Sequence, residues 1–388
     1  MTCYQKEEKN MLAICNATLI MKDHLIPDGV ILCEDGKIVD FGKSLPIPAS
    51  AQVLDAKGQY VGPGFVDIHT HAAGEYWFYE NPKTAGEIAL HHGVTTVLPV
   101  VYFSMNKKDF IQATRDIQDA VKRGELPNFG GFYMEGPYMN PKFGCDRESN
   151  PWQAPCDPAD YLDIIRQGGK DVRVWVVAPE RENIEEFVIA CKKENPDVVF
   201  SVGHSEATPD EIEKLMPYGL KIGTHHTNAT GTLQKYPECR TPCVDETVQY
   251  NAEIYAEIIC DSMGIHVDPY NQRLIRKIKG PDRLILISDA CVFGGPIPDG
   301  YDGVKDLCFD FAGEIAGSKL TLDVACRNFM VHTGASLVDV FHYASYNPAK
   351  AVGFTDRGEI RRGLAADLVI CDHAVNVSQV ILKGKPVL

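Results

Sequence analysis

The sequence predicts an α/β protein in which a (β/α)8 TIM-like barrel carries a small β-sandwich domain built from both ends of the chain. Three observations predict this fold. Apolar β-type runs alternate with helical patterns through the middle of the chain. Both ends instead contain short β-type runs separated by turn residues. Finally, 388 residues are enough for one large barrel with a smaller appendage.

The two ends of the chain share one pattern. Residues 1–62 contain β-type runs separated by Gly, Pro and Asp turn signals, at 12–14, 30–33, 37–41 and 52–55. Residues 358–388 continue the pattern, with runs at 367–371 and 380–382 and a Lys-Gly-Lys-Pro turn. We therefore expect the two segments to pair into one small β-domain beside a barrel of residues 63–357.

The middle of the chain repeats strand and helix. After a first apolar strand at 64–71, β-type runs follow at 95–101, 129–134, 172–178, 198–203, 221–224, 256–260 and 284–288. Helical patterns cover 107–123, 183–193, 209–216 and 269–279. Such alternation indicates parallel strands with crossover helices, and roughly eight strands suit a barrel. A doubly wound sheet is the alternative, but no glycine-rich dinucleotide fingerprint follows the first strand.

Composition restricts the partners and the compartment. Lys and Arg number 38 against 53 Asp and Glu, and the net charge of -15 disfavours nucleic acid and anionic membrane surfaces as partners. The N-terminus lacks the apolar core of a signal peptide, and no uncharged run is long enough to span a bilayer. The 13 scattered cysteines do not form a disulfide framework, and we expect Cys239 and Cys243 to be loop thiols. We expect a cytoplasmic protein.

Metal-binding side chains stand where the predicted strands end. The first strand ends in His69-Thr70-His71, and strand alternation places both imidazoles on one side. Four later strands end in a carboxylate or an imidazole: Glu135, His204, His225 and Asp289. Active sites of barrel enzymes form at this carboxyl end of the strands. We therefore expect these six residues to converge on one or two metal ions per chain.

The donor set indicates the metal and its chemistry. Imidazole and carboxylate ligands suit Zn²⁺, which we expect, and also Fe²⁺, Mn²⁺ or Co²⁺. Such a metal activates water and polarises a carbonyl, and a nearby carboxylate then serves as general base. By alternation His226 points away from the metal and is structural. We expect Asp67 to hydrogen-bond behind the ligands rather than to bind metal.

The detail of these motifs resembles the amidohydrolase superfamily and, within it, the N-acetylglucosamine-6-phosphate deacetylase family. The resemblance runs over most of the chain, at residues 63–71, 93–96, 135–141, 178–180, 203–205, 224–229, 264–267, 288–290, 347–349 and 363–369. It implies that Glu135, His204 and His225 bind the principal metal. It also implies that His69 and His71 bind a second metal together with Glu135 and Asp289.

The resemblance further implies roles around the substrate. Asp289 takes a proton from the attacking water and later delivers it to the departing amine. Asn228 and Ala229 match contacts to the sugar phosphate, His266 matches a substrate-binding histidine, and Arg240 matches a phosphate-binding arginine. The family also implies a homodimer and a small-molecule amino-sugar substrate.

The sequence departs from the family pattern in three places. Phe143-Gly144-Cys145-Asp146 replaces the usual Lys-Gly-Ala-His, whose histidine helps to polarise the acetamide carbonyl. An ionised Asp146 cannot donate, so either Arg147 takes this place, the metal polarises alone, or the substrate differs. The segment around Arg240 is longer than the family's, and Asp245-Glu246 adds negative charge beside it.

The predicted reaction is hydrolysis of the acetamide of an N-acetylated amino-sugar phosphate, with N-acetylglucosamine 6-phosphate giving glucosamine 6-phosphate and acetate. The alternatives within catalysis are a related N-acyl sugar or an N-acyl amino acid. A cyclic-amide hydrolase would need a metal-bridging lysine at a strand end, and a deaminase a His-x-x-Glu helix. Neither is found in the sequence. Retention of every expected ligand and of Asp289 argues against a non-catalytic scaffold.

Overall fold

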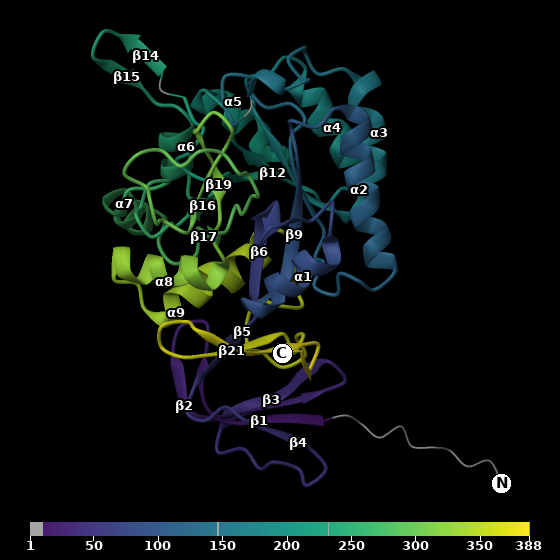
Figure 1. The fold of residues 1–388 in the computed structure, drawn as a ribbon, viewed down its shortest axis with the longest axis vertical. Coiled ribbons are helices and arrows are strands. Elements are labelled where there is room, and N and C mark those ends of the chain that lie inside the picture. The colour runs from purple at the N-terminus through teal and green to yellow at the C-terminus, as the bar shows by residue number, and fades with distance from the viewer. Residues whose placement is uncertain (1–10, 146, 232, 388) are drawn as a thin grey trace, which may run out of the picture.

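A computed structural model describes residues 11–145, 147–231 and 233–387 of the chain. The protein consists of a barrel and a smaller sheet domain stacked along its long axis (Figure 1). From residue 11 onward the chain first forms strands of the sheet domain, then builds the barrel, and finally returns to the sheet domain. The described helices include none that is both long and apolar enough to cross a membrane.

The sheet domain combines strands from both ends of the chain, as predicted. Its order is β22-β21-β20-β5-β1-β2-β3, with β4 beside β1, and β20 joins β5 antiparallel. Ile14, Ile31 and Ile370 belong to its own buried core. The strands are β1 (Met11–Ile20), β2 (Leu25–Glu34), β3 (Lys37–Lys43), β4 (Gln52–Asp55), β5 (Tyr60–Pro63), β20 (Leu368–Cys371), β21 (Val377–Leu382) and β22 (Lys385–Pro386).

The larger body is the predicted barrel of eight parallel strands, in the order β17-β16-β13-β12-β11-β10-β9-β6. The last strand returns to the first, where the Asp289 N–H donates to the His69 carbonyl at 2.9 Å. This closure rules out the doubly wound alternative. The strands are β6 (Phe65–Thr70), β9 (Val94–Tyr102), β10 (Phe132–Glu135), β11 (Val172–Val177), β12 (Val199–Val202), β13 (Leu220–Gly223), β16 (Tyr255–Ile259) and β17 (Leu284–Ile287).

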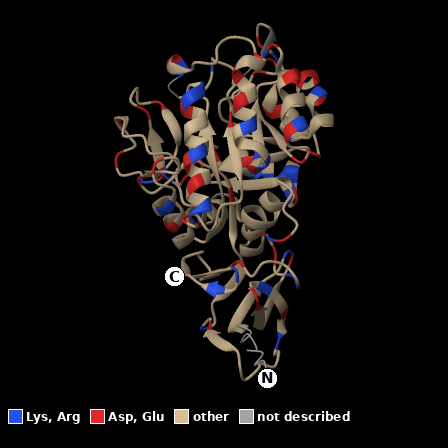
Figure 2. Cartoon of the chain, turned by 90° about the vertical axis from the view of Figure 1, so that its right-hand side faces the viewer, with Lys and Arg blue, Asp and Glu red and all other residues tan. Residues whose placement is uncertain are grey.

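Amphipathic helices cover the outside of the barrel, and Figure 2 shows that they carry charges of both signs. In α2, Asn106 caps the first turn, and Phe110 and Ile117 pack inward. Each of the four predicted helices is present. The helices are α1 (Pro82–His91), α2 (Lys107–Lys122), α3 (Pro158–Gly168), α4 (Ile184–Glu194), α5 (Pro209–Leu215), α6 (Val244–Tyr250), α7 (Pro269–Lys279), α8 (Leu322–Thr333), α9 (Leu337–Phe341) and α10 (Asn347–Ala351).

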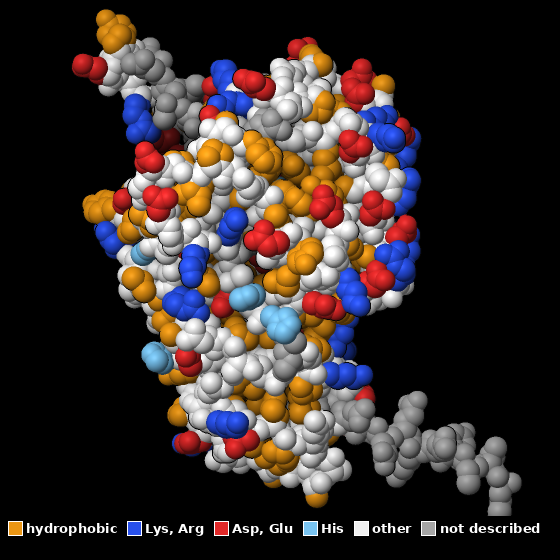
Figure 3. Space-filling model, in the orientation of Figure 1, with side chains coloured by type: hydrophobic (Ala, Val, Ile, Leu, Met, Phe, Trp, Pro, Cys, Tyr) orange, Lys and Arg blue, Asp and Glu red, His pale blue; other side chains and the backbone are white. Residues whose placement is uncertain are grey.

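Three short hairpins leave the barrel framework. They are β7–β8 (Ala72–Ala73 and Tyr76–Trp77), β14–β15 (Leu233–Tyr236 and Cys239–Thr241) and β18–β19 (Leu307–Phe309 and Ile315–Ser318). The β14–β15 hairpin projects away from the body of the molecule (Figure 1). The same projection is visible in the space-filling view of the molecule (Figure 3). Cys239 is exposed on this hairpin, whereas Cys243 is buried just before α6.

Candidate active site

The barrel brings the six predicted metal ligands together at the carboxyl ends of its strands. Glu135 ends β10, while His204, His225 and Asp289 each stand two residues beyond β12, β13 and β17. These last three have positive φ angles, of 46°, 29° and 46°. Non-glycine residues adopt this conformation at a cost of order 1–3 kcal/mol each, and such strain is concentrated at functional sites. The backbone is therefore held in a strained shape that directs these side chains inward.

Glu135, His204 and His225 form the first group of converging side chains, and all three are buried. The Glu135 Oε1 atom lies 2.8 Å from His204 Nε2 and 3.2 Å from His225 Nε2. The two imidazole Nε2 atoms lie 3.0 Å apart. His225 is oriented from behind, because its Nδ1 lies 3.2 Å from the Asn228 carbonyl oxygen.

His69, His71 and Asp289 form the second group, which is also buried. Asp289 Oδ1 lies 3.5 Å from His69 Nε2 and 3.2 Å from His71 Nε2. Glu135 connects the two groups, since its Oε2 lies 3.3 Å from His71 Nε2. The His69 Nε2 atom is buried and has no hydrogen-bond partner among the described residues.

Electrostatics couple these groups strongly. Burial alone would lower the pKa of His69, but Asp289, Glu257 and Glu135 together raise the pKa of this imidazole to about 10. Burial would likewise raise the pKa of Asp289, yet His69 and His71 hold that pKa well below its usual range. The site is thus rich in ionised carboxylate, and it favours positive charge at its centre.

The residues fit a divalent metal at each group. Tetrahedral coordination at about 2.0–2.1 Å places ligand atoms about 3.3 Å apart. The separations of 2.8, 3.2 and 3.0 Å around Glu135 Oε1, His204 and His225 match this spacing. The unpartnered Nε2 of His69 also gains a partner if a cation lies between it and Asp289. The donor types and this geometry both support a divalent metal cofactor.

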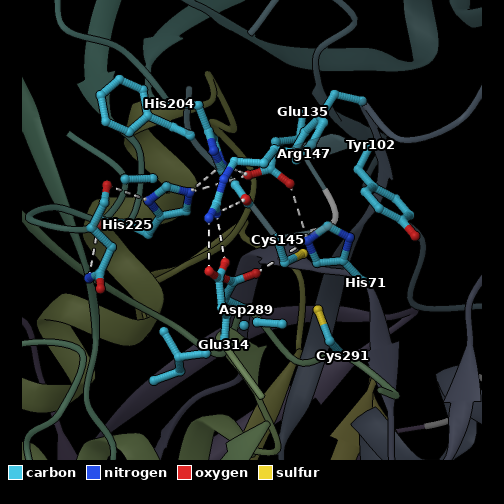
Figure 4. Close-up of a pocket in the computed structure, with 18 of the residues that line it drawn as sticks. His71, Tyr102, Glu135, Cys145, Arg147, His204, His225, Asp289, Cys291 and Glu314 are labelled. Carbon is cyan, nitrogen blue, oxygen red and sulfur yellow. Dashed lines mark hydrogen bonds and ion pairs between the residues drawn. The ribbon is translucent and has the colours of Figure 1, made fainter. Parts of the chain in front are cut away.

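A cavity of about 400 Å³ opens onto these ligands, and its size suits a small molecule. Trp77, Tyr102, Phe103, Phe143 and Phe293 line it. The rings of Trp77 and Tyr102 stack with their centroids 6.1 Å apart. Figure 4 shows the side chains of His71, Glu135, His204, His225 and Asp289 pointing toward one another, with Cys145 and Arg147 nearby.

Three of the predicted substrate residues, Asn228, Ala229 and His266, line the cavity. Asn228 stabilises a turn after His225, because its backbone N–H and its Nδ2 both donate to the His225 carbonyl. His266 is held on both sides: its Nδ1 lies 2.9 Å from Asp261 Oδ2, and its Nε2 lies 3.0 Å from the Gly317 carbonyl oxygen. These contacts fix the His266 ring at the cavity wall.

The three remaining predictions have different outcomes. Arg147 lines the cavity, and its Nη1 and Nη2 donate to the Glu314 carboxylate at 2.6 and 2.8 Å. Arg240 does not line the cavity; it is exposed on the β14–β15 hairpin and donates to Glu246 at 2.6 Å. Asp146 lies outside the described residues.

Sequence reasoning missed Glu257, a carboxylate in β16 whose side chain is completely buried. Its Oε2 atom lies 3.2 Å from His69 Nδ1 and accepts the His225 N–H at 3.1 Å. The sequence did contain a signal, because a carboxylate in a buried apolar strand needs a partner. Its partners, however, come from other strands and could not be read from the local pattern.

Comparison with known proteins finds similarity to amidohydrolases and to amino-sugar-phosphate deacetylases. The sequence profile of the amidohydrolase family matches residues 284–387. An N-acetylglucosamine-6-phosphate deacetylase of Lysinibacillus sphaericus is 26% identical over 395 residues, covering 96% of this chain and 97% of the relative. An N-acetylgalactosamine-6-phosphate deacetylase of Escherichia coli O157:H7 is 26% identical over 385 residues, covering 95% and 97%.

A solved structure extends the comparison to a substrate complex. A mutant N-acetyl-D-glucosamine-6-phosphate deacetylase of Mycobacterium smegmatis, in complex with N-acetyl-D-glucosamine-6-phosphate, is 25% identical with a TM-score of 0.80. The match covers 98% of this chain and 100% of that chain. The likeness therefore includes both the barrel and the sheet domain.

Proposed function

Because this chain is a relative of the N-acetylglucosamine-6-phosphate deacetylases within the amidohydrolase superfamily, we propose that it hydrolyses the acetamide of an N-acetylated amino-sugar phosphate. The favoured substrate is N-acetylglucosamine 6-phosphate, which would give glucosamine 6-phosphate and acetate. One observation carries the proposal. The two groups of buried side chains, the second of which includes the Asp289 carboxylate, meet at the wall of an aromatic-lined cavity large enough for a monosaccharide.

The proposed chemistry divides between the metal and the chain's own residues. Glu135, His204 and His225 would hold one ion, and His69, His71 and Asp289 a second. A divalent metal at these sites supplies Lewis acidity, which makes water more acidic and an amide carbonyl more electrophilic. The Asp289 carboxylate lines the cavity beside both groups, so it can accept the proton of the attacking water. As the C–N bond breaks, Asp289 returns this proton to the amine nitrogen.

The cavity walls suit an amino sugar. Trp77 and Tyr102 offer flat apolar faces on which the apolar face of a pyranose can rest. His266, Asn228 and Ala229 lie at the same cavity and are proposed to contact the sugar. Two cations also line it, Lys142 paired with Glu206 and Arg147 paired with Glu314. We assign the phosphate to Arg147, because Arg240 lies on the projecting hairpin.

Three finer properties belong to the same proposal. We propose zinc as the resident metal, since imidazole and carboxylate donors suit it, with Fe²⁺, Mn²⁺ or Co²⁺ as substitutes. A homodimer and a cytoplasmic location are proposed from the family resemblance and the scattered cysteines.

The decisive experiment measures acetate release from a panel of sugars. The panel contains N-acetylglucosamine 6-phosphate, its galacto and manno epimers, and the three unphosphorylated sugars. We expect the highest kcat/KM for the gluco phosphate, and the galacto epimer tests the relationship to the second relative. Equal rates on phosphorylated and free sugars would rule out phosphate recognition. If no sugar releases acetate, the substrate must be another N-acyl compound.

A further inference from the structure

Glu257 is a buried carboxylate that the proposed reaction does not use. It lies in the middle of β16, its side chain has no solvent exposure, and it does not line the cavity. His69 also has no exposed surface, and it lies between Glu257 and the other ligands. Because an isolated buried carboxylate is costly, its position calls for specific partners.

A single oxygen of Glu257 collects three contacts from three different strands or strand ends. Its Oε2 lies 3.2 Å from His69 Nδ1, accepts the Tyr133 hydroxyl at 3.2 Å, and accepts the His225 N–H at 3.1 Å. The other oxygen, Oε1, has no partner among the residues that the structure describes. The contacts are therefore concentrated on the oxygen that faces the histidines.

These contacts decide which nitrogen of His69 faces the ligand group. Glu257 Oε2 already accepts from Tyr133 and His225, so we infer that Nδ1 of His69 donates its hydrogen to the same oxygen, which leaves Nε2 as the nitrogen that faces a metal. That Nε2 points toward Asp289 Oδ1, 3.5 Å away. The Tyr133 ring packs against the imidazole, with centroids 4.3 Å apart, and limits its rotation. Glu257 thus selects the tautomer, and Tyr133 the ring plane, that a metal ligand requires.

We propose that Glu257 is a positioning residue that makes His69 a metal ligand and fixes it relative to His225. The inference rests on the proposed metal centre. The same oxygen holds the His225 backbone, where φ is 29°, so one carboxylate connects both ligand groups. By contrast, the Nδ1 atoms of His71 and His204 have no hydrogen-bond partner in the described part of the chain.

The test is Zn²⁺ binding by the Glu257→Gln variant, measured by competition with a chromogenic chelator. Glutamine keeps the size of the side chain but removes the charge that selects the His69 tautomer. We expect the affinity of the His69, His71 and Asp289 group to fall by roughly 10- to 100-fold, the usual effect of losing such a partner. Binding by Glu135, His204 and His225 should change much less. A merely structural defect would instead weaken both groups alike.

Tyr133→Phe is the matched control, because it keeps the ring that packs against His69 and the contact between the carboxylate and His69 Nδ1, while it removes the hydroxyl that donates to Glu257 Oε2. We expect this variant to bind zinc like the wild type. The proposal is overturned if Glu257→Gln matches the wild type in both the number of ions and their affinities. Failure of the wild-type protein to bind zinc at all would instead contradict the proposed function, so the two failures are distinguishable.

A measurement on the unmodified chain covers the case in which Glu257→Gln does not fold. In zinc-loaded protein labelled with ¹⁵N-histidine, the His69 signal should show a hydrogen on Nδ1 and none on Nε2. The signal is assigned by its loss in His69→Asn. A His69 ring that carries its hydrogen on Nε2 would overturn the proposal.

Discussion

Asp289 combines a strained backbone with an ionised side chain. Its φ is 46°, and the histidines beside it keep the pKa of its carboxylate low. Asp289→Asn preserves the shape of the side chain but removes the base, so we expect kcat to fall by roughly 10²–10⁴-fold. Zinc bound by Glu135, His204 and His225 should largely remain. Steady-state kinetics and elemental analysis check both statements.

Asp116→Asn, on the exposed surface of α2, is the matched control and should leave kcat unchanged. Near-normal turnover in Asp289→Asn would place the base elsewhere in the site. Complete loss of zinc from this variant would show instead that Asp289 is needed mainly as a ligand.

His204 tests the metal centre itself. Its Nε2 lies 2.8 Å from Glu135 Oε1, so His204→Ala removes one of three converging ligands. We expect one or two transition-metal ions per wild-type chain and markedly lower occupancy in the variant. Elemental analysis after zinc-supplemented expression measures both, and His373→Ala, on the exposed surface, is the control. Fewer than about half an ion per wild-type chain would contradict the proposed centre.

Two arginines on different elements of the barrel are candidates for binding the substrate phosphate. Arg147 lies in the loop after β10 and lines the cavity, whereas Arg240 is on the β14–β15 hairpin. We expect Arg147→Ala to raise KM for the phosphorylated sugar by roughly 10- to 100-fold, because charge-assisted hydrogen bonds are lost. Arg240→Ala serves as the matched variant and should change KM little. The reverse result would assign the phosphate to Arg240 and contradict the proposed role of Arg147.

Lys279 connects helix α7 to the end of helix α6, and its buried amine makes the free energy of unfolding depend on pH. Its buried Nζ, at the end of α7, donates to the carbonyls of Val248 and Asn251 at 2.6 and 2.7 Å. Burial, and then Arg283, lower the pKa of Lys279 to about 8. In the unfolded chain a lysine keeps its proton up to about pH 10.4. Between these values the unfolded state binds more protons, so this lysine makes stability rise with pH.

We therefore expect the wild type to gain stability relative to Lys279→Met between about pH 8 and pH 10, by at most about 1.4 kcal/mol per pH unit. Urea unfolding at several pH values measures this difference. Lys277→Met, an exposed lysine on the same helix, should not alter the slope. A difference independent of pH would show that Lys279 is charged throughout this range.

For the whole molecule, the family resemblance predicts a homodimer. Light scattering should therefore give twice the chain mass of 42.9 kDa across the micromolar range. The net charge of -15 makes two copies repel each other, so the dimer should strengthen when added salt screens this repulsion. A mass of one chain at every concentration and salt level would contradict the prediction.

The sequence by itself determined the barrel and the set of His, Glu and Asp side chains that converge at its carboxyl end. Alternating apolar strands and amphipathic helices specify parallel β/α units, and the predicted helix over 269–279 coincides with α7. Parallel strands end at one face, so residues that follow them, such as His204 and Asp289, had to lie near one another. Helix α3 was missed although Asp157 and Pro158 provide a start signal.

Only the tertiary structure decided which buried groups pair with one another. Glu257 contacts His69 across 188 residues of sequence, and Arg147 contacts Glu314 across 167. Such pairs depend on the strand order around the barrel and on the path of its loops. Neither of these produces a local hydrophobic pattern that can be recognised in the sequence. The same applies to Arg240, because the direction of a hairpin is set by packing at its base. Local periodicity therefore predicts elements and their ends, while desolvation and pairing across the closed barrel select the contacts.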